Sequence, residues 1–199
     1  MKGFTIKTEI EEYDTFEQYA AQADLGPQDL VLCGEHTYDK YVAPLSLGVQ
    51  TLFREKYGKG EPTDGMVDAI LDALRKKEFN RIIAIGGGTV VDIAKVVAVA
   101  GKEDKVDDLY DNVDKLKKVH PLVIIPTTCG TGSEVTNISV INRVSKGVKM
   151  GLASNAMLAD KAVMITNMLD SLPYKIFATS SIDAMVHSVE SFLRPNGCT

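Results

Sequence analysis

Three short, predominantly apolar segments most restrict the fold that this chain can adopt. They comprise residues 30–33, 81–85 and 122–126, and longer segments of helical character separate them. None of the three alternates apolar with polar residues, so neither face of such a strand is suited to water. Buried strands separated by helices are typical of a parallel sheet that helices cover on both faces. We therefore predict an α/β domain of the doubly wound, Rossmann-like type.

Further elements are predicted around these strands. Thr63 is suited to cap a helix, because its hydroxyl can accept a hydrogen bond from the first helical turn. Residues 102–118 are highly charged and are expected to form a solvated loop or a short helix. The other predicted elements are strands at 49–53 and 162–165, a hairpin of strands 135–141 and 148–152, and helices at 40–47, 63–77 and 90–100.

Composition argues against several classes of partner and favours one location. The net charge of −5 argues against nucleic acid or an anionic membrane as the main partner. The chain has no apolar leader and no apolar run long enough to span a bilayer, so a cytoplasmic location is expected. Cys33, Cys129 and Cys198 show no paired spacing, which favours reduced thiols over disulfides.

A domain boundary is expected near Leu172–Pro173. Residues 1–172 would form the α/β domain, and residues 173–199 would open a helical second domain that this chain does not contain. Thr179, Ser180 and Ser181 resemble a helix cap ahead of a helix that runs to residue 193. The apolar side chains of this helix should be exposed, so we expect it to be mobile or to contact another copy.

Two loops rich in glycine and hydroxyl groups follow predicted strands. Gly-Gly-Gly-Thr at 86–89 joins a strand to a helix, where a close backbone approach and free N–H groups would suit a phosphate. Residues 126–134, Pro-Thr-Thr-Cys-Gly-Thr-Gly-Ser-Glu, follow the next buried strand. Ligands of open α/β sheets bind at this edge. The alternatives are a tight packing turn for the first loop and hydroxyls that satisfy loop backbone groups in the second.

Asp183 and His187 are four residues apart and would share one face of a helix. They could bind one metal ion from the same side, or merely hydrogen-bond to each other. A catalytic divalent metal usually needs at least three protein ligands. His36 and His120 lie far from this pair in sequence, so the pair, if it binds a metal, would be half of a metal site.

Taken together, these motifs resemble the iron-containing alcohol dehydrogenases. Residues 86–95, 126–134, 149–151 and 183–187 occur in the order and spacing of that family, and Glu-Pro-Thr at 61–63 fits the same pattern. The resemblance runs from about residue 30 to the end of the chain, and its details are most like the 4-hydroxybutyrate dehydrogenase branch. Family chains are nearly twice as long and carry a helical second domain.

The resemblance implies a nucleotide site. Gly87, Gly88 and Thr89 match the family's pyrophosphate loop, and Asp92 matches a carboxylate near the nicotinamide. The remaining nucleotide contacts that it implies are Thr127, Thr128, Thr136 and Lys149. Glu35 follows the first buried strand, where a carboxylate can accept a hydrogen bond from a ribose 2′-hydroxyl and would repel a 2′-phosphate. This predicts NAD rather than NADP, unless Glu35 is simply a solvated glutamate.

The resemblance also implies a metal and a reaction. Asp183 and His187 match two of four catalytic metal ligands, the others being histidines further downstream, and the metal is iron or zinc. The implied reaction transfers a hydride between NAD and a primary alcohol, such as 4-hydroxybutyrate, or its aldehyde, with the metal polarising the substrate oxygen. We expect a homo-oligomer, a dimer, and no activity from the 199 residues alone. Two alternatives are a nucleotide-binding module without turnover and a relative of glycerol dehydrogenase or dehydroquinate synthase.

Overall fold

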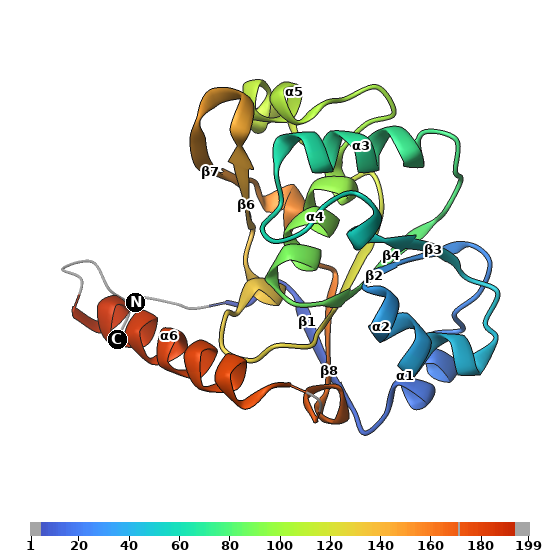
Figure 1. Ribbon diagram of the computed structural model, residues 1–199. Coiled ribbons are helices and arrows are strands. Elements are labelled where there is room, and N and C mark those ends of the chain that lie inside the picture. The colour runs from blue at the N-terminus through green and yellow to red at the C-terminus, as the bar shows by residue number, and fades with distance from the viewer. Residues whose placement is uncertain (1–4, 171, 194–199) are drawn as a thin grey trace.

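The computed structural model describes residues 5–170 and 172–193, and a six-stranded parallel sheet with helices on both faces dominates it (Figure 1). The strand order is β1-β8-β5-β4-β2-β3, and every neighbouring pair is parallel. This confirms the predicted doubly wound α/β fold. The strands are β1 (Glu9–Tyr13), β2 (Asp29–Cys33), β3 (Gln50–Phe53), β4 (Arg81–Gly86), β5 (Leu122–Pro126) and β8 (Lys161–Ile165).

The sheet has two cores because alternate residues of each central strand point to opposite faces. Leu30 and Leu32 of β2 belong to the core under α3 (Asp64–Leu74), α4 (Gly88–Val99) and α5 (Val106–Asp111). Their neighbours Val31 and Cys33 belong to the other core, under α1 (Phe16–Gln22) and the helical segment after β2. Since all four side chains are fully buried, the strand has no need of polar alternation.

The helical segment after β2 begins earlier than predicted, at α2 (Glu35–Thr37), and continues through a π-helix (Tyr38–Val42) and a 3-10 turn (Ala43–Leu45). Helix α3 begins as predicted, because the Thr63 hydroxyl accepts a 3.2 Å hydrogen bond from the backbone N–H of Met66. Helix α4 begins two residues before the expected position, so the glycines at 87 and 88 form its cap and first turn.

Strand β1 was not predicted. Its five residues include three glutamates, and it lies at the sheet edge, where it pairs only with β8. Lys161 of β8 forms ion pairs with Glu9 and Glu11 of β1. Charged side chains are tolerated in this position because an edge strand is open to water on one side.

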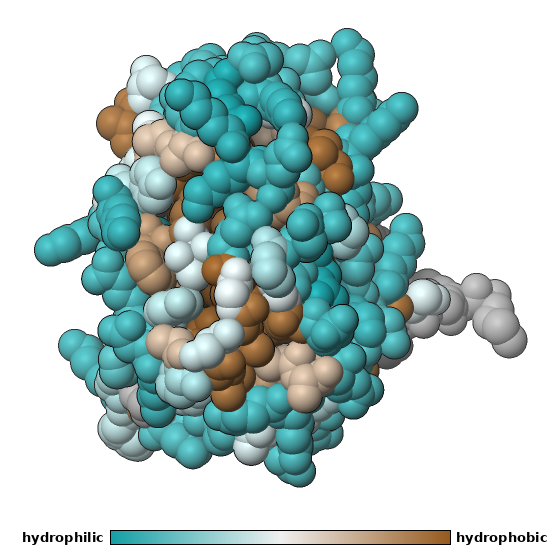
Figure 2. Space-filling view, turned by 90° about the vertical axis from the view of Figure 1, so that its right-hand side faces the viewer, coloured by the Kyte–Doolittle hydropathy of each residue, from teal (hydrophilic) through white to brown (hydrophobic). Residues whose placement is uncertain are grey.

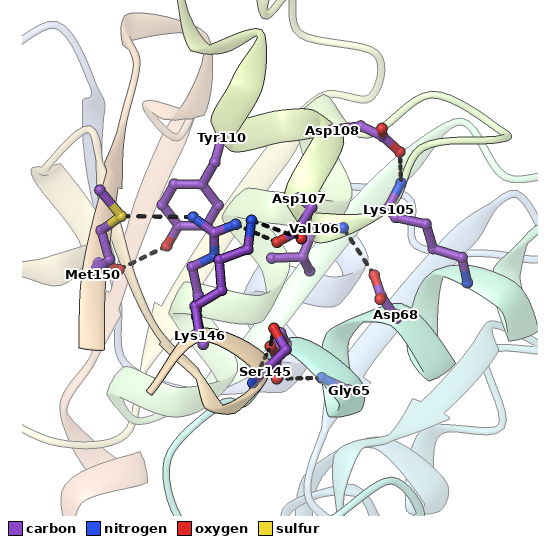
Figure 3. Close-up of polar contacts among 12 residues, drawn as sticks. Gly65, Asp68, Lys105, Val106, Asp107, Asp108, Tyr110, Ser145, Lys146 and Met150 are labelled. Atoms are coloured by element: carbon purple, nitrogen blue, oxygen red, sulfur yellow. Dashed lines mark hydrogen bonds and ion pairs between the residues drawn. The ribbon is translucent and has the colours of Figure 1, made fainter. Parts of the chain in front are cut away.

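A two-stranded hairpin of β6 (Ile138–Arg143) and β7 (Val148–Ala153) projects beside α5 (Figure 1). The hairpin was predicted, although its first strand begins at residue 138 rather than 135. Polar contacts fix the hairpin to the main domain, including the ion pair between Lys146 and Asp107 (Figure 3). Arg143 also pairs with Asp107. Ser145, in the turn of the hairpin, donates its backbone N–H to a carboxylate oxygen of Asp64, 3.1 Å away, at the start of α3.

Helix α6 (Tyr174–Leu193) extends away from the sheet, with none of its side chains buried (Figure 1). Residues 179–181 do not cap it, contrary to expectation. The Thr179 hydroxyl donates to the Lys175 carbonyl at 2.9 Å, and the Ser180 hydroxyl donates to the Ile176 carbonyl at 2.9 Å. Both hydroxyls therefore bond back into a continuous helix. Within residues 5–170 and 172–193, no helix has the length and apolar character needed to cross a membrane.

Candidate functional site

Two loops meet where the parallel strands β4 and β5 end. We call residues 86–89 the glycine loop and residues 126–134 the threonine loop. The backbone N–H of Thr127 donates to the Gly86 carbonyl at 3.2 Å. A Cβ atom on Gly87 would lie 3.2 Å from Cγ2 of Thr128, closer than most such contacts, so glycine permits this approach. The sequence-predicted loops are therefore in direct contact.

The glycine loop presents the amino end of α4. Gly87 is the N-cap residue, and its carbonyl accepts the first helical hydrogen bonds from Val90 and Val91. The N–H groups of Gly88 and Thr89 lie in the first turn, where a helix provides no partner for them. A Cβ atom on Gly88 would meet nothing within 4 Å. This open helix terminus fits the diphosphate of a dinucleotide.

Behind the glycine loop, α4 carries two charged groups in largely buried positions. Burial raises the pKa of Asp92 to about 6, and Lys95 opposes this shift. Burial lowers the pKa of Lys95 to about 8, against the effects of Asp92 and Glu134. The Lys95 ammonium donates to the Thr136 hydroxyl at 3.0 Å and to the Ile138 carbonyl at 2.8 Å.

Sequence analysis singled out Asp92 and Thr136 but missed Lys95. The available signal was a lysine in the middle of an otherwise apolar helix, between Ala94 and Val96. Such a residue is rarely buried unless it has polar partners. Ser139, also missed, donates its hydroxyl to the Asp92 carbonyl at 3.0 Å. Helix α4 and the hairpin are thus joined at two points.

Lys149 of β7 reaches the same region. Its charge lowers the pKa of Asp92, and its Nζ lies 2.7 Å from a carboxylate oxygen of Glu61. The preceding residue, Gly60, accepts a 3.3 Å hydrogen bond from the Thr89 hydroxyl. The segment before α3 therefore closes one side of the glycine loop.

Glu35 is exposed at the carboxyl end of β2, as the first residue of α2. The carboxylate of Glu55, which was not predicted from the sequence, packs against Gly34, the residue before Glu35. A Cβ atom on Gly34 would lie 2.6 Å from Oε1 of Glu55. The carboxyl ends of the neighbouring parallel strands β2 and β3 are thus followed by one acidic side chain each, Glu35 and Glu55.

Asp183 and His187 lie together on α6, with 3.6 Å between Oδ2 and Nδ1. Their side chains are 55% and 64% exposed. The donor types suit iron or zinc, but the described part of the chain contains no group of three or more His, Cys, Asp or Glu residues that could hold a metal. This pair therefore fits part of a metal site, and a full coordination shell needs further ligands.

Helix α6 touches the threonine loop. Gly130 has a φ of +96°, and a Cβ on it would lie 2.6 Å from the Ser180 carbonyl oxygen. The Sγ of Cys129 is 3.6 Å from the Ser180 hydroxyl. A cavity of about 140 Å³ between this loop and the end of β8 is lined in part by Thr128 and Glu134. The helix that carries the metal pair is therefore docked next to the candidate nucleotide site.

The opposite, amino edge of the sheet has larger hollows, of about 350 and 640 Å³. Figure 2 shows the molecule from that side, with hydrophobic residues gathered at its centre within a hydrophilic margin. Phe79 and His120 stack there, with ring centroids 4.3 Å apart. None of the sequence-predicted site residues lines either hollow. The larger cavities thus lie at the amino edge of the sheet, whereas the predicted site residues lie at the carboxyl edge. We assign the candidate site to the carboxyl edge because of these residues.

Comparisons with known proteins agree with the motifs. The family model for iron-containing alcohol dehydrogenases matches residues 10–166. The chain is 40% identical over 196 residues to 4-hydroxybutyrate dehydrogenase of Clostridium kluyveri, covering 98% of this chain and 53% of that protein. It is 34% identical over 133 residues to sulfoacetaldehyde reductase of Bilophila wadsworthia, covering 66% of this chain and 34% of that protein.

A solved structure gives the same result. The crystal structure of an iron-containing alcohol dehydrogenase from Thermotoga maritima superposes with a TM-score of 0.82 at 27% identity, covering 99% of this chain and 56% of that one. The chain spans about half the length, or less, of the relatives it matches. On the family match, the shared fold and the paired loops, this chain belongs to the iron-containing alcohol dehydrogenase family.

Proposed function

We propose that the whole protein transfers a hydride between NAD and a primary alcohol, with 4-hydroxybutyrate and succinate semialdehyde as the substrate pair. The observation that carries the proposal is the contact between Gly87 and Thr128 at the open amino end of α4. The choice of substrate rests on the 40% identity to a 4-hydroxybutyrate dehydrogenase. Residues 1–172 would be the nucleotide-binding domain and residues 173–199 the start of a helical metal-binding domain.

The protein's own groups would bind and orient the dinucleotide. First-turn N–H groups of Gly88 and Thr89 would donate to the diphosphate. Glu35 would accept a hydrogen bond from the ribose 2′-hydroxyl. Glu55, packed against Gly34 from the turn after β3, would add a second carboxylate there, with Arg54 Nε 3.9 Å from its Oε1. These carboxylates support NAD over NADP.

Asp183 and His187 would hold iron, or zinc, through one carboxylate oxygen and one imidazole nitrogen. When bound, NAD supplies the hydride acceptor and the metal supplies the Lewis acid that lowers the pKa of the alcohol. The contact between Gly130 and Ser180 sets α6 against the threonine loop. Asp183 and His187 would then lie on the nucleotide side of the sheet. A cleft closed on that side would also exclude water from the reaction.

A second candidate is a nucleotide-binding module without turnover. The observation in its favour is that the described residues bring together only two metal ligands. Side-by-side assays of the natural-length protein with 4-hydroxybutyrate, glycerol and simple primary alcohols separate the possibilities. Oxidation of 4-hydroxybutyrate supports the dehydrogenase, oxidation of glycerol alone supports a glycerol-dehydrogenase-like enzyme, and NADH binding without oxidation of any of them supports the module.

The nucleotide site is tested by Gly88→Ala, monitored by NADH fluorescence titration. The added methyl group meets nothing within 4 Å in the free protein, so folding should be unaffected or slightly favoured. A diphosphate seated on the helix terminus would collide with it. We expect NADH affinity to fall by about tenfold or more, which corresponds to ~1.4 kcal/mol.

Gly65→Ala is the matched control. Gly65 lies in the first turn of α3, and a Cβ there also meets nothing within 4 Å. This variant should gain the same small stabilisation and leave NADH affinity unchanged. Equal affinities of the two variants for NADH would contradict the assignment of the glycine loop.

A further inference from the structure

Lys95 is a fully buried cation with a specific set of partners. Its side chain is 0% exposed, and its ammonium donates to the Thr136 hydroxyl and to the Ile138 carbonyl. Burying a charge costs free energy unless polar groups compensate for it. Asp92 and Glu134 both favour its charged form against the effect of burial. At pH 7 Lys95 therefore keeps its proton and acts only as a hydrogen-bond donor.

This donor determines what the Thr136 hydroxyl can do. A hydroxyl has one hydrogen to donate and two lone pairs that accept. One lone pair of Thr136 Oγ1 accepts from Lys95 at 3.0 Å, and its hydrogen is directed to the Ser133 carbonyl at 3.3 Å. One lone pair remains. Thr136 is only partly buried, so a ligand bound between the glycine loop and the threonine loop would have access to it.

We infer that Lys95 is a positioning residue that presents Thr136 as a hydrogen-bond acceptor, so that Thr136 recognises a hydroxyl or amide N–H donor of the dinucleotide and not its phosphates. A phosphate oxygen offers no hydrogen to the remaining lone pair, whereas a ribose hydroxyl or the nicotinamide carboxamide does. The inference rests on the proposed NAD site and assigns different parts of the dinucleotide to different groups of that site. The amino end of α4 would bind the phosphates, and Thr136 would accept a hydrogen bond from an uncharged donor.

The hydrogen bond between Lys95 and Thr136 joins two segments of the candidate nucleotide site. Lys95 belongs to the helix that begins at Gly88, and Thr136 immediately follows the short 3-10 turn (Ser133–Val135) that closes the threonine loop. Lys95 therefore connects the glycine loop to the threonine loop, which would bind different parts of one ligand. Moving Thr136 away from Lys95 would leave its lone pairs free and its orientation undetermined.

The test compares Thr136→Val, Thr136→Ser, Lys95→Met and the double variant Lys95→Met/Thr136→Val in the natural-length protein. NADH dissociation constants and KM for NAD are measured, with the folded fraction checked by urea unfolding. We expect Thr136→Val to weaken NADH binding about three- to tenfold, the effect of one lost neutral hydrogen bond. Thr136→Ser should bind like the wild type. Lys95→Met should weaken binding as Thr136→Val does, and the double variant should be no weaker than either.

KM for NAD should rise in Thr136→Val, Lys95→Met and the double variant by a larger factor than kcat at saturating NAD falls, which a general loss of structure would not produce. Lys95→Gln keeps an N–H donor and should lose less affinity than Lys95→Met; it also replaces Lys95→Met if that variant does not fold. Titration with ADP-ribose separates the two donors. A Thr136→Val penalty that persists with ADP-ribose identifies a ribose hydroxyl, and one confined to NADH identifies the carboxamide.

Several results would overturn the inference. NADH binding that Thr136→Val leaves unchanged, or penalties of Lys95→Met and Thr136→Val that add in the double variant, would remove it while leaving the proposed function intact. No NADH binding by the wild-type protein would instead overturn the proposed function, and this inference with it.

Discussion

Asp92 is the residue at which the fold most clearly changes acid–base chemistry. Burial raises its pKa to about 6 from an ordinary value of 3.8. The folded protein therefore binds more protons at this carboxyl than the unfolded chain does between pH ~4 and ~6. Stability falls with rising pH wherever the folded state holds the extra proton. Ionised Asp92 thus destabilises the fold above pH 6, even with Lys95 nearby.

The prediction is that Asp92→Asn removes this pH dependence. The free energy of unfolding of the variant, minus that of the wild type, should rise by about 1–3 kcal/mol between pH 4 and pH 6.5 and then level off. Urea unfolding at several pH values measures the difference directly, and the acidic groups elsewhere in the protein cancel in it. A difference that stays flat over this range would mean that Asp92 ionises as it would in water.

Site residues that depend on local backbone geometry could be predicted from the sequence. Site residues that depend on contacts with distant parts of the chain could not. Gly87 and Thr128 were identified because glycine and hydroxyl residues directly follow apolar strands. Lys95 is bonded to a side chain 41 positions away, and its role arises only when α4 packs under the hairpin. Glu55 and Ser139 were missed for the same reason. Their partners are set by the tertiary fold alone.

The hairpin is the element whose placement most affects the site, since it carries Lys149 and begins two residues after Thr136. Arg143 anchors it from a buried position, where it pairs with Asp107 and stacks 4.3 Å from the centroid of the Tyr110 ring. We expect Arg143→Met to lower the free energy of unfolding by about 1–3 kcal/mol, because it removes a charge-assisted bond between a buried guanidinium and a half-exposed carboxylate, together with a cation–π contact. NADH affinity should fall with it. Urea unfolding and NADH titration measure the two effects.

Lys146→Met is the control for this anchor. Lys146 also pairs with Asp107, with 3.2 Å between its Nζ and a carboxylate oxygen, but its side chain is 48% exposed. An exposed ion pair contributes little, so this variant should change stability by no more than about 0.5 kcal/mol. If Lys146→Met lowers the free energy of unfolding as much as Arg143→Met does, the hairpin is stabilised by charge pairing with Asp107 in general and not by the buried Arg143 side chain.

At the level of elements, the apolar strands of the sheet were predictable and its charged edge was not. Strands β2, β4 and β5 are buried on both faces, so their sequences carry a clear signal. Strand β1 is largely exposed, and a sequence with three glutamates is more typical of a loop than of a strand. Only its pairing with β8, which places Lys161 next to these glutamates, identifies it as a strand. In α6, Thr179 and Ser180 resembled a cap because hydroxyl residues suit both a helix start and bonds back to the preceding turn.

For the molecule as a whole, all the predicted nucleotide contacts gather at one edge of the sheet, and α6 leaves the domain from that edge. The chain spans 53% of the length of the Clostridium kluyveri relative. Along α6 the apolar side chains of Tyr174, Met185, Val189 and Phe192 are between 50% and 82% exposed. An exposed apolar face of this kind is typical of a surface that other protein covers. A second copy of the chain would cover this face.

We therefore expect the 199-residue chain to self-associate through α6, and sedimentation velocity over a range of concentrations to show species heavier than a monomer. Val189→Asp should shift the population toward monomer, because a charge in the apolar face costs free energy when the face is covered. Val119→Asp is the matched control, since Val119 is also 50% exposed, as Val189 is, but lies at the amino edge of the sheet. Equal shifts for the two variants would place the contact elsewhere. A wild-type chain that is monomeric at every concentration would show that the face of α6 remains open in solution.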